Sequence, residues 1–126
     1  MNAMSPVEAP LDMLIVGAGI SGIGMAAKLA THCPAKRYLM LDRRQGFGGT
    51  WDLFRYPGIR SDSDMHTFAY QFAPWTEDET IASAEQIKAY LGHVVESHHI
   101  RDKMRFAIVT AEAFMSKLEK LERTAP

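Results

Sequence analysis

Apolar residues in the first third of the chain form two short continuous runs separated by a helical pattern. Residues 13–16 and residues 38–41 are uninterrupted apolar runs, which are typical of parallel strands buried on both faces. Between them, apolar residues recur at helical spacing until Pro34, which marks the end of this helix. The order predicts a βαβ unit that extends from about residue 11 to residue 42.

A second helix is predicted in the later part of the chain. Ser83 followed by Gln86 forms a capping-box pattern, in which each side chain satisfies a backbone amide of the other residue. From Ile87 onward, apolar residues recur at i, i+3, i+4, i+7 and i+8, as on an amphipathic helix that continues to His98.

Weaker patterns surround this helix. Residues 103–110 alternate as in a third strand, and residues 112–122 space their apolar side chains like a short final helix. Residues 43–82 are irregular and rich in glycine, aromatic and charged residues. A stretch of this length within a compact domain is usually functional.

The predicted fold class is α/β, with a Rossmann-type βαβ unit that begins a parallel sheet and leaves it incomplete. We divide the chain into a flexible leader (residues 1–10), a partial Rossmann-type domain (residues 11–111) and a tail with helical spacing (residues 112–126).

A glycine fingerprint stands at the turn between the first strand and the first helix. Gly17, Gly19 and Gly22 have the spacing G-x-G-x-x-G, and Asp42 closes the second strand twenty residues later. Gly17 permits the tight turn, Gly19 admits a pyrophosphate close to the backbone, and Gly22 lets the helix pack near the strands. A turn that binds no ligand is the alternative interpretation, and the complete strand–turn–helix–strand context disfavours it.

The start of this helix predicts an anion site. Backbone amides near Ile20 and Ser21 lie at the positive dipole end of the helix, where a pyrophosphate is stabilised. We expect the Asp42 carboxylate to accept hydrogen bonds from the adenosine ribose. The same carboxylate repels a 2′-phosphate, which disfavours NADP at this site although Arg43 and Arg44 follow.

A second glycine-rich loop bears on the choice between NAD and FAD. Gly46, Gly48, Gly49, Thr50 and Trp51 follow the carboxyl end of the second predicted strand. An NAD site has little need for such a loop, whereas the ribityl chain and flavin ring of FAD use both loop backbone and aromatic side chains. The sequence therefore favours FAD, with an ordinary surface turn as the alternative interpretation of this loop.

Two stretches of the sequence carry a resemblance to a known family. They are Gly17-Ala18-Gly19-Ile20-Ser21-Gly22 with Asp42, and Gly48-Gly49-Thr50-Trp51-Asp52-Leu53-Phe54-Arg55-Tyr56-Pro57-Gly58-Ile59-Arg60-Ser61-Asp62. They resemble class B flavoprotein monooxygenases, above all the Baeyer–Villiger monooxygenases of the branch that activates thioamide prodrugs in mycobacteria. The likeness extends over residues 11–106, which is nearly the whole chain.

The resemblance implies roles for particular residues. The cofactor-binding residues that it implies are Gly17, Gly19, Ile20, Ser21, Gly22, Asp42, Arg43, Gly49, Thr50, Trp51 and Asp62. The fingerprint glycines would meet the FAD pyrophosphate and Asp42 the ribose, while Gly49, Thr50 and Trp51 would lie along the flavin. Asp62 would approach the isoalloxazine and nicotinamide region, and it is the one catalytic candidate.

The resemblance also implies an activity. Enzymes of this family reduce FAD with NADPH and use O2 to oxygenate a small ketone or a sulfur-containing substrate. They run to several hundred residues, with a second glycine fingerprint for NADPH, a linker signature containing His and Trp, and a catalytic arginine; none of the three is in this sequence. We therefore expect the FAD-binding N-terminal part of an NADPH-dependent monooxygenase, which alone is not catalytically competent.

Two alternatives to this function stay open. One is a dinucleotide-binding module without chemistry of its own, which a complementing chain with the NADPH domain would complete. The other is a truncated remnant that binds no cofactor and acts at most as an interaction piece.

Composition and charge narrow the class further. The chain has 126 residues, of which 47% are hydrophobic and 23% charged, and a formal net charge of -1, which predicts a globular domain without nucleic-acid or membrane partners. The longest uncharged run, residues 13–27, is too short to span a bilayer. Cys33 is the only cysteine, and the first residues lack the pattern of a signal peptide, so a cytoplasmic location is predicted.

For three further groups of residues, we either favour a structural role over a functional site or leave both interpretations open. We predict no metal site, because His93 and His98 do not share a helix face and no carboxylate completes a ligand set with them. We predict packing rather than a pocket for Phe68, Tyr70, Phe72 and Trp75. An active-site loop and a solvated face are equally consistent with Arg55, Arg60, Asp62 and Asp64.

Overall fold

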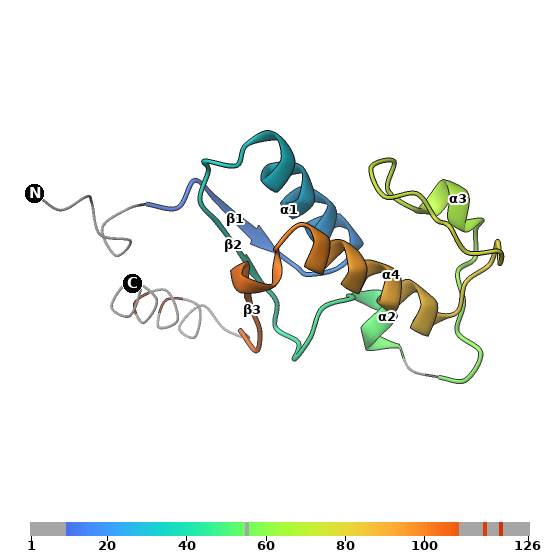
Figure 1. The fold of residues 1–126 in the computed structure, drawn as a ribbon. Coiled ribbons are helices and arrows are strands. Elements are labelled where there is room, and N and C mark those ends of the chain that lie inside the picture. The colour runs from blue at the N-terminus through green and yellow to red at the C-terminus, as the bar shows by residue number, and fades with distance from the viewer. Residues whose placement is uncertain (1–9, 55, 109–114, 116–118, 120–126) are drawn as a thin grey trace, which may run out of the picture.

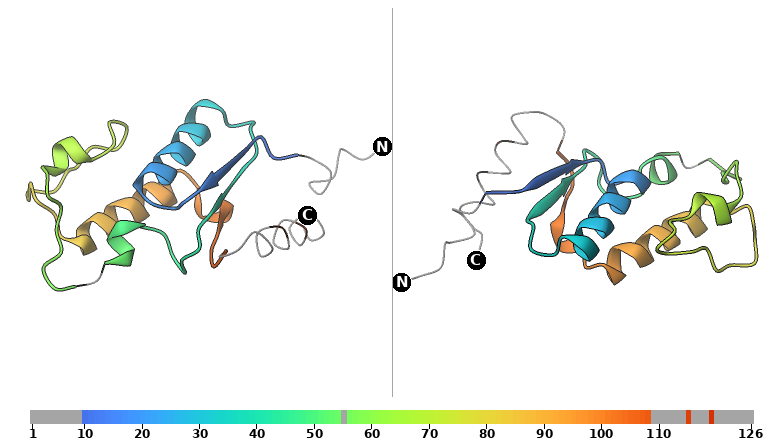
Figure 2. Two further views of the ribbon diagram at one scale, coloured as in Figure 1. Left: turned by 180° about the vertical axis from the view of Figure 1, so that it is seen from behind. Right: turned by 90° about the horizontal axis from the view of Figure 1, so that it is seen from above.

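The computed structural model describes residues 10–54, 56–108, 115 and 119, whose path Figure 1 traces. The described elements are β1 (Met13–Val16), α1 (Ile20–His32), β2 (Tyr38–Leu41), α2 (Thr50–Leu53), α3 (Met65–Phe68), α4 (Ala84–Ser97), a 3-10 helix (Arg101–Lys103) and β3 (Met104–Arg105). The sheet lies at one end of the molecule and α3 at the other (Figures 1 and 2). The predicted leader, Pro10 apart, and the predicted final helix, Met115 and Glu119 apart, lie outside the described residues.

The sheet is parallel and has the strand order β1-β2-β3. β1 and β2 pair residue for residue from Met13 with Tyr38 to Val16 with Leu41, and Met40 pairs with Met104 of β3. Parallel neighbours need a crossover connection, and α1 and α4 lie in the two crossovers. The predicted α/β class and the Rossmann-type βαβ unit are therefore confirmed.

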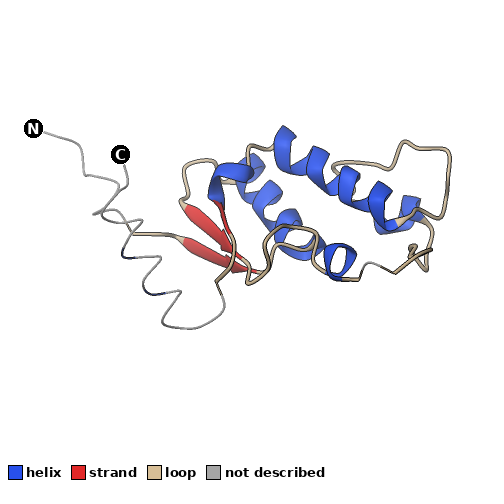
Figure 3. Cartoon of the chain, turned by 90° about the horizontal axis from the view of Figure 1, so that it is seen from below, coloured by secondary structure: helices blue, strands red, loops and turns tan. Residues whose placement is uncertain are grey.

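The two long helices pack against one another beside the sheet (Figure 3). α1 contacts β1 and β2, while α4 contacts α1 and α2. The fully buried side chains of the shared core include Ile23, Met40, Ile87, Leu91 and Val94. Burial of each large aliphatic side chain contributes about 1.5–3 kcal/mol, so this core fixes α4 relative to the strands.

The capping box predicted for the second long helix is present. The Ser83 hydroxyl accepts a hydrogen bond from the Gln86 amide at 3.2 Å, and the Gln86 side-chain oxygen accepts one from the Ser83 amide at 2.8 Å. Two amides that α4 cannot satisfy internally are thereby paired, so the helix begins at a defined residue.

The prediction that the first strand is buried on both faces is wrong. Ile15 is buried, but Leu14 is 37% exposed and Val16 is 80% exposed. Successive side chains of a strand point to opposite faces, and α1 packs on the side of Ile15. Pairing with β2 occupies only one edge of β1, and α1 covers the face of Ile15, so Leu14 and Val16, which point to the opposite face, stay exposed.

The third predicted strand is much shorter than residues 103–110. Only Met104 and Arg105 pair with β2, because Ala107 has a φ of +62° that turns the backbone out of the extended conformation. The Ala107 amide still donates to the Arg44 carbonyl oxygen at 2.9 Å. The chain therefore continues to follow the segment after β2 without a regular ladder; residues 109–110 lie outside the described residues.

The irregular stretch after β2 contains the one-turn helices α2 and α3 and is tied back to the start of α4. Ser61, which is buried, donates its amide to the Ala82 carbonyl oxygen at 2.9 Å and accepts the Ala82 amide on its hydroxyl at 3.1 Å. Trp75 is buried in the core, with Phe68 and Tyr70 packed against it. The packing interpretation is confirmed for Phe68, Tyr70 and Trp75, whereas Phe72 is 38% exposed and stacks on the Tyr70 ring.

Tyr70 joins this stretch to the first turn of α1. Its hydroxyl donates to the Ile20 carbonyl oxygen, and its amide donates to the Tyr90 hydroxyl at 2.9 Å. Burial raises the pKa of the Tyr70 phenol well above its ordinary value of 10.0, and the neighbouring Tyr90 raises it further. The folded chain therefore holds Tyr70 neutral.

We expect Tyr70→Phe to lower the free energy of unfolding at pH 8 by about 1 kcal/mol, through loss of the hydrogen bond to Ile20. Because the folded pKa is raised, the unfolded phenol ionises first, and the stabilisation is lost as the pH rises above its ordinary pKa. The gap between wild type and variant should therefore narrow between pH 8 and about pH 11 in urea unfolding. An unchanged gap would contradict the role assigned to Tyr70.

Candidate functional site

Two glycine-rich loops that are distant in the sequence meet at the carboxyl ends of β1 and β2. The Gly48 amide donates a hydrogen bond to the Ala18 carbonyl oxygen at 2.9 Å. A Cβ atom at Gly49 would lie 3.0 Å from the Gly19 Cα, and a Cβ atom at Gly19 would lie 3.5 Å from the Gly49 Cα. The two loops therefore touch backbone to backbone.

A cavity of about 280 Å³ opens between these loops. It is lined by Val16, Gly17, Gly19, Ile20, Ser21, Gly22, Gly48, Gly49, Thr50 and Trp51. Eight of the eleven residues predicted to bind a cofactor are among them, so tertiary folding brings the fingerprint and the second loop to one cavity. The cavity lies at the carboxyl ends of parallel strands, where open α/β sheets bind their ligands.

Gly17 and Gly22 have the local structural roles that the fingerprint spacing predicts. Gly17 has a φ of +108°, which makes the tight turn after β1. A Cβ atom at Gly22 would lie 1.9 Å from the Gly17 carbonyl oxygen and 3.3 Å from the Ile15 Cγ2. Only glycine at position 22 lets the first turn of α1 pack this closely on the strand.

The first turn of α1 offers backbone amides to the cavity. Gly19 is the N-cap and has no side chain to cap them, and the first turn contains no acidic residue. By contrast, α4 satisfies its own first amides through Ser83 and Gln86. The start of α1 is therefore suited to an anionic group such as a pyrophosphate.

Asp42 lies beside the cavity and holds the fingerprint loop in place. Its Oδ2 accepts the Ala18 amide at 2.8 Å, and its Oδ1 accepts the Arg44 amide at 2.9 Å. Each carboxylate oxygen has a second lone pair, so both remain able to accept a hydroxyl. The sequence anticipated an acidic residue at this strand end but not its bond to the glycine loop.

The other predicted site residues lie elsewhere. Arg43 is exposed after β2, and Asp62 is exposed in the loop between α2 and α3. Neither residue lines the cavity between the glycine loops. Trp51 lines that cavity, and it also lines a neighbouring cavity of about 220 Å³, to which Lys88 of α4 contributes.

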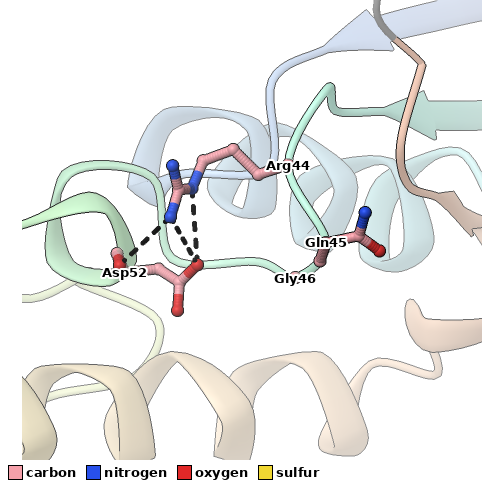
Figure 4. A pocket seen from close by; sticks show the side chains of 4 residues that line it. All are labelled: Arg44, Gln45, Gly46 and Asp52. Carbon is pink, nitrogen blue, oxygen red and sulfur yellow. Dashed lines mark hydrogen bonds and ion pairs between the residues drawn. The ribbon is translucent and has the colours of Figure 1, made fainter.

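A buried ion cluster that the sequence analysis missed lies behind the second loop. Asp52, only 5% exposed, accepts Arg44 Nη2 at 3.2 Å and Lys88 Nζ at 2.7 Å. Figure 4 shows the Arg44 side chain reaching to Asp52, while the Gln45 side chain points away. Arg44 lies eight residues before Asp52, and Lys88 lies 36 residues after it. Asp52 stands in the stretch that carries the family resemblance, but no motif spacing connects the three residues, so the sequence did not identify them as a cluster.

The described part of the chain contains neither a cluster of metal-ligating side chains nor a membrane-spanning helix. Across residues 10–54, 56–108, 115 and 119, no three His, Cys, Asp or Glu side chains gather as a metal site requires. None of the helices in this described part of the chain combines the length and apolar character needed to cross a membrane.

The fold and this cavity define a dinucleotide-binding domain of the Rossmann type, and comparison with known proteins gives its family. Residues 15–78 match the family described as NAD(P)-binding Rossmann-like domain. The chain belongs to this family.

Curated relatives that the chain resembles are named as FAD-binding or FAD-containing monooxygenases. It is 54% identical over 100 residues to the probable FAD-binding monooxygenase AlmA of Acinetobacter sp, covering 79% of this chain and 20% of the relative. It is 50% identical over 96 residues to the FAD-containing monooxygenase EthA of Mycobacterium tuberculosis, which covers 76% of this chain and 20% of the relative. The chain thus spans about a fifth of the length of the relatives it matches.

Solved monooxygenase structures are similar to the chain as well. An oxidized steroid monooxygenase bound to NADP has a TM-score of 0.69 and 32% identity, covering 76% of this chain and 19% of that one. OTEMO in complex with FAD and NADP has a TM-score of 0.68 and 28% identity, and the match covers 77% of this chain and 19% of that one. The resemblance to monooxygenases of the Baeyer–Villiger type is therefore confirmed.

The close contact at Gly22 gives a prediction about the fingerprint. We expect Gly22→Ala to lower the free energy of unfolding by about 1–3 kcal/mol, because its Cβ would collide with the Gly17 carbonyl. Gly46→Ala is the matched control, since a Cβ there has no atom within 4 Å. Urea unfolding checks both, and equal stabilities of the two variants would contradict the packing role of Gly22.

Proposed function

We propose that this chain is the FAD-binding part of a flavin- and NADPH-dependent monooxygenase. The observation that carries the proposal is the cavity formed by the two glycine loops, since it joins an open helix N-terminus to an aromatic side chain, Trp51. An adenosine diphosphate needs the first feature, and a flavin uses the second. Relatives named as FAD-containing monooxygenases support this choice over NAD.

The residues fit the cofactor at its adenosine end. Gly17, Gly19 and Gly22, with the amides near Ile20 and Ser21, would hold the pyrophosphate. Asp42 would accept the adenosine ribose hydroxyls, and Arg43 lies next to it in the chain. Among the described residues no ionisable side chain lines the cavity, so amides and the helix dipole would stabilise the pyrophosphate.

At the other end, Gly49, Thr50 and Trp51 would lie along the flavin. Asp62 remains our candidate for the isoalloxazine and nicotinamide region, although its side chain is exposed and does not line the cavity. The cofactor-binding unit that we propose spans residues 11–111, with a leader at residues 1–10 and a tail at residues 112–126.

When bound, the flavin supplies the redox chemistry, with NADPH as reductant and O2 as oxidant. We propose a small ketone or a sulfur-containing compound as substrate in the whole enzyme and a cytoplasmic location. Because these residues contain one fingerprint, an NADPH domain from another segment or a complementing chain would be required for turnover. The 126 residues by themselves are therefore proposed not to be catalytically competent.

Gly19→Val tests the cavity directly. Gly19 has φ −89° and ψ −165°, which valine adopts without strain, so the added methyl groups act by filling the space beside Gly49. We expect FAD affinity, measured by flavin fluorescence titration, to fall about tenfold or more. Gly46→Val is the control, because the space around its Cβ is open. Equal affinity in wild type and Gly19→Val would refute the site, and absence of binding to wild type would favour the remnant that binds no cofactor.

Asp42→Ala tests the adenosine end. The change removes a charged acceptor from the ribose and from the Ala18 amide, so we expect FAD affinity to fall by about 10- to 100-fold. Isothermal titration calorimetry with FAD measures the change. An effect below about twofold would mean that Asp42 holds the loop without meeting the cofactor.

A further inference from the structure

A continuous series of polar contacts connects the glycine fingerprint with α4. The Ala18 and Arg44 amides share the Asp42 carboxylate. The Arg44 guanidinium donates to Asp52 Oδ2 at 3.2 Å, and it also donates to the Asp52 carbonyl oxygen at 3.3 Å. Lys88 donates to Asp52 Oδ1 at 2.7 Å. Arg44 therefore contacts the adenosine end through its backbone and the flavin end through its side chain.

The Asp52 carboxylate is costly to leave unpaired. Its side chain is 8% exposed, whereas those of Arg44 and Lys88 are 27% and 38% exposed. A buried carboxylate that loses a cationic partner is strongly destabilised, because it cannot regain its hydration without movement of the backbone. Loss of either partner should therefore displace the turn that carries Asp52.

That turn is the second glycine loop itself. Asp52 lies in α2, whose first residues are Thr50 and Trp51, and its amide donates to the Gly49 carbonyl oxygen at 3.0 Å. A Cβ atom at Gly48 would lie 3.1 Å from the Asp52 Cβ and 3.7 Å from the Lys88 Cγ. A displacement of Asp52 would therefore also move Gly48 and Gly49, which line the cavity.

We infer that Arg44, Asp52 and Lys88 are positioning residues that hold the second glycine loop against the fingerprint and so set the affinity for the flavin end of the cofactor. The inference rests on the proposed function for the identity of the ligand. Because the cluster lies behind the flavin side, it should matter for FAD and much less for ADP, which needs the fingerprint and Asp42 alone. A residue that merely stabilised the fold would affect both ligands equally.

Lys88→Met is the main test variant, since it removes the charge from a partly exposed side chain and keeps its apolar stem. Arg44→Met is the second variant, and Arg44→Lys is a partial rescue that restores a cation without the planar fork. Glu96→Gln is the matched control, because it breaks an ion pair with Arg101 whose side chains are 56% and 61% exposed. Such exposed pairs contribute little to stability.

Two measurements are made on each purified chain. Calorimetric titration with FAD and with ADP should show FAD binding weakened about tenfold in Lys88→Met and Arg44→Met, with ADP binding within about twofold of wild type. Hydrogen exchange without cofactor, followed by mass spectrometry, should show faster exchange in residues 46–54 and unchanged exchange in α1 and α4. Arg44→Lys should recover part of both effects, and Glu96→Gln should show neither.

The inference is overturned if FAD and ADP affinities fall together, if exchange rises across the whole chain, or if nothing changes. If the wild-type chain binds neither FAD nor ADP, the proposed function fails. The exchange comparison still decides the inference in that case, since faster exchange confined to residues 46–54 supports the positioning role and unchanged exchange there refutes it.

Discussion

The close contact between two glycine-rich turns is the constraint on which this structure depends. The Gly48 amide bonds to the Ala18 carbonyl oxygen, and Gly19 and Gly49 approach so closely that neither has room for a large side chain. Gly48 and Gly49 have φ values of +119° and +54°, which side chains rarely allow. The walls of the cavity are therefore largely backbone, which can approach a phosphate group and donate its amides.

The surrounding elements keep this contact in register. Asp42, at the end of β2, accepts a hydrogen bond from the fingerprint loop. Lys88 of α4 donates to Asp52 and so holds the second loop against this helix. The position of α4 depends in turn on its capping box and on its buried face, which includes Ile87 and Leu91. The local hydrogen-bond pattern at Ser83 defines the start of the helix that carries Lys88, the partner of Asp52.

Neutral walls distinguish this cavity from sites that bind anions with arginine or lysine. Among the described residues no charged side chain lines it, and the nearby Arg44 side chain is directed to Asp52. Recognition of a pyrophosphate would then come from the amides and dipole of α1. Such a site discriminates by close approach and shape, and a side chain at Gly19 or Gly49 would reduce the space between the two loops.

The sequence by itself determined the βαβ unit, the second long helix with its capping box, and the residues of both glycine loops. These features are local: periodicity, caps and the freedom of glycine are properties of neighbouring residues, and they are visible in one dimension. The family resemblance followed from the same stretches. The local pattern predicted burial wrongly where distant segments decide it. In β1, Leu14 and Val16 are exposed although they belong to an apolar run.

The tertiary structure alone decided which residues meet. It shortened the third strand, because Ala107 adopts a positive φ, and it placed Asp42 on the Ala18 amide. It also brought Arg44, Asp52 and Lys88 together. No spacing rule connects these three residues, since their contact depends on how the loop after β2 folds back onto α4. Contacts between such distant residues follow from the packing of the whole core, and that packing is not a property of any one segment of the sequence.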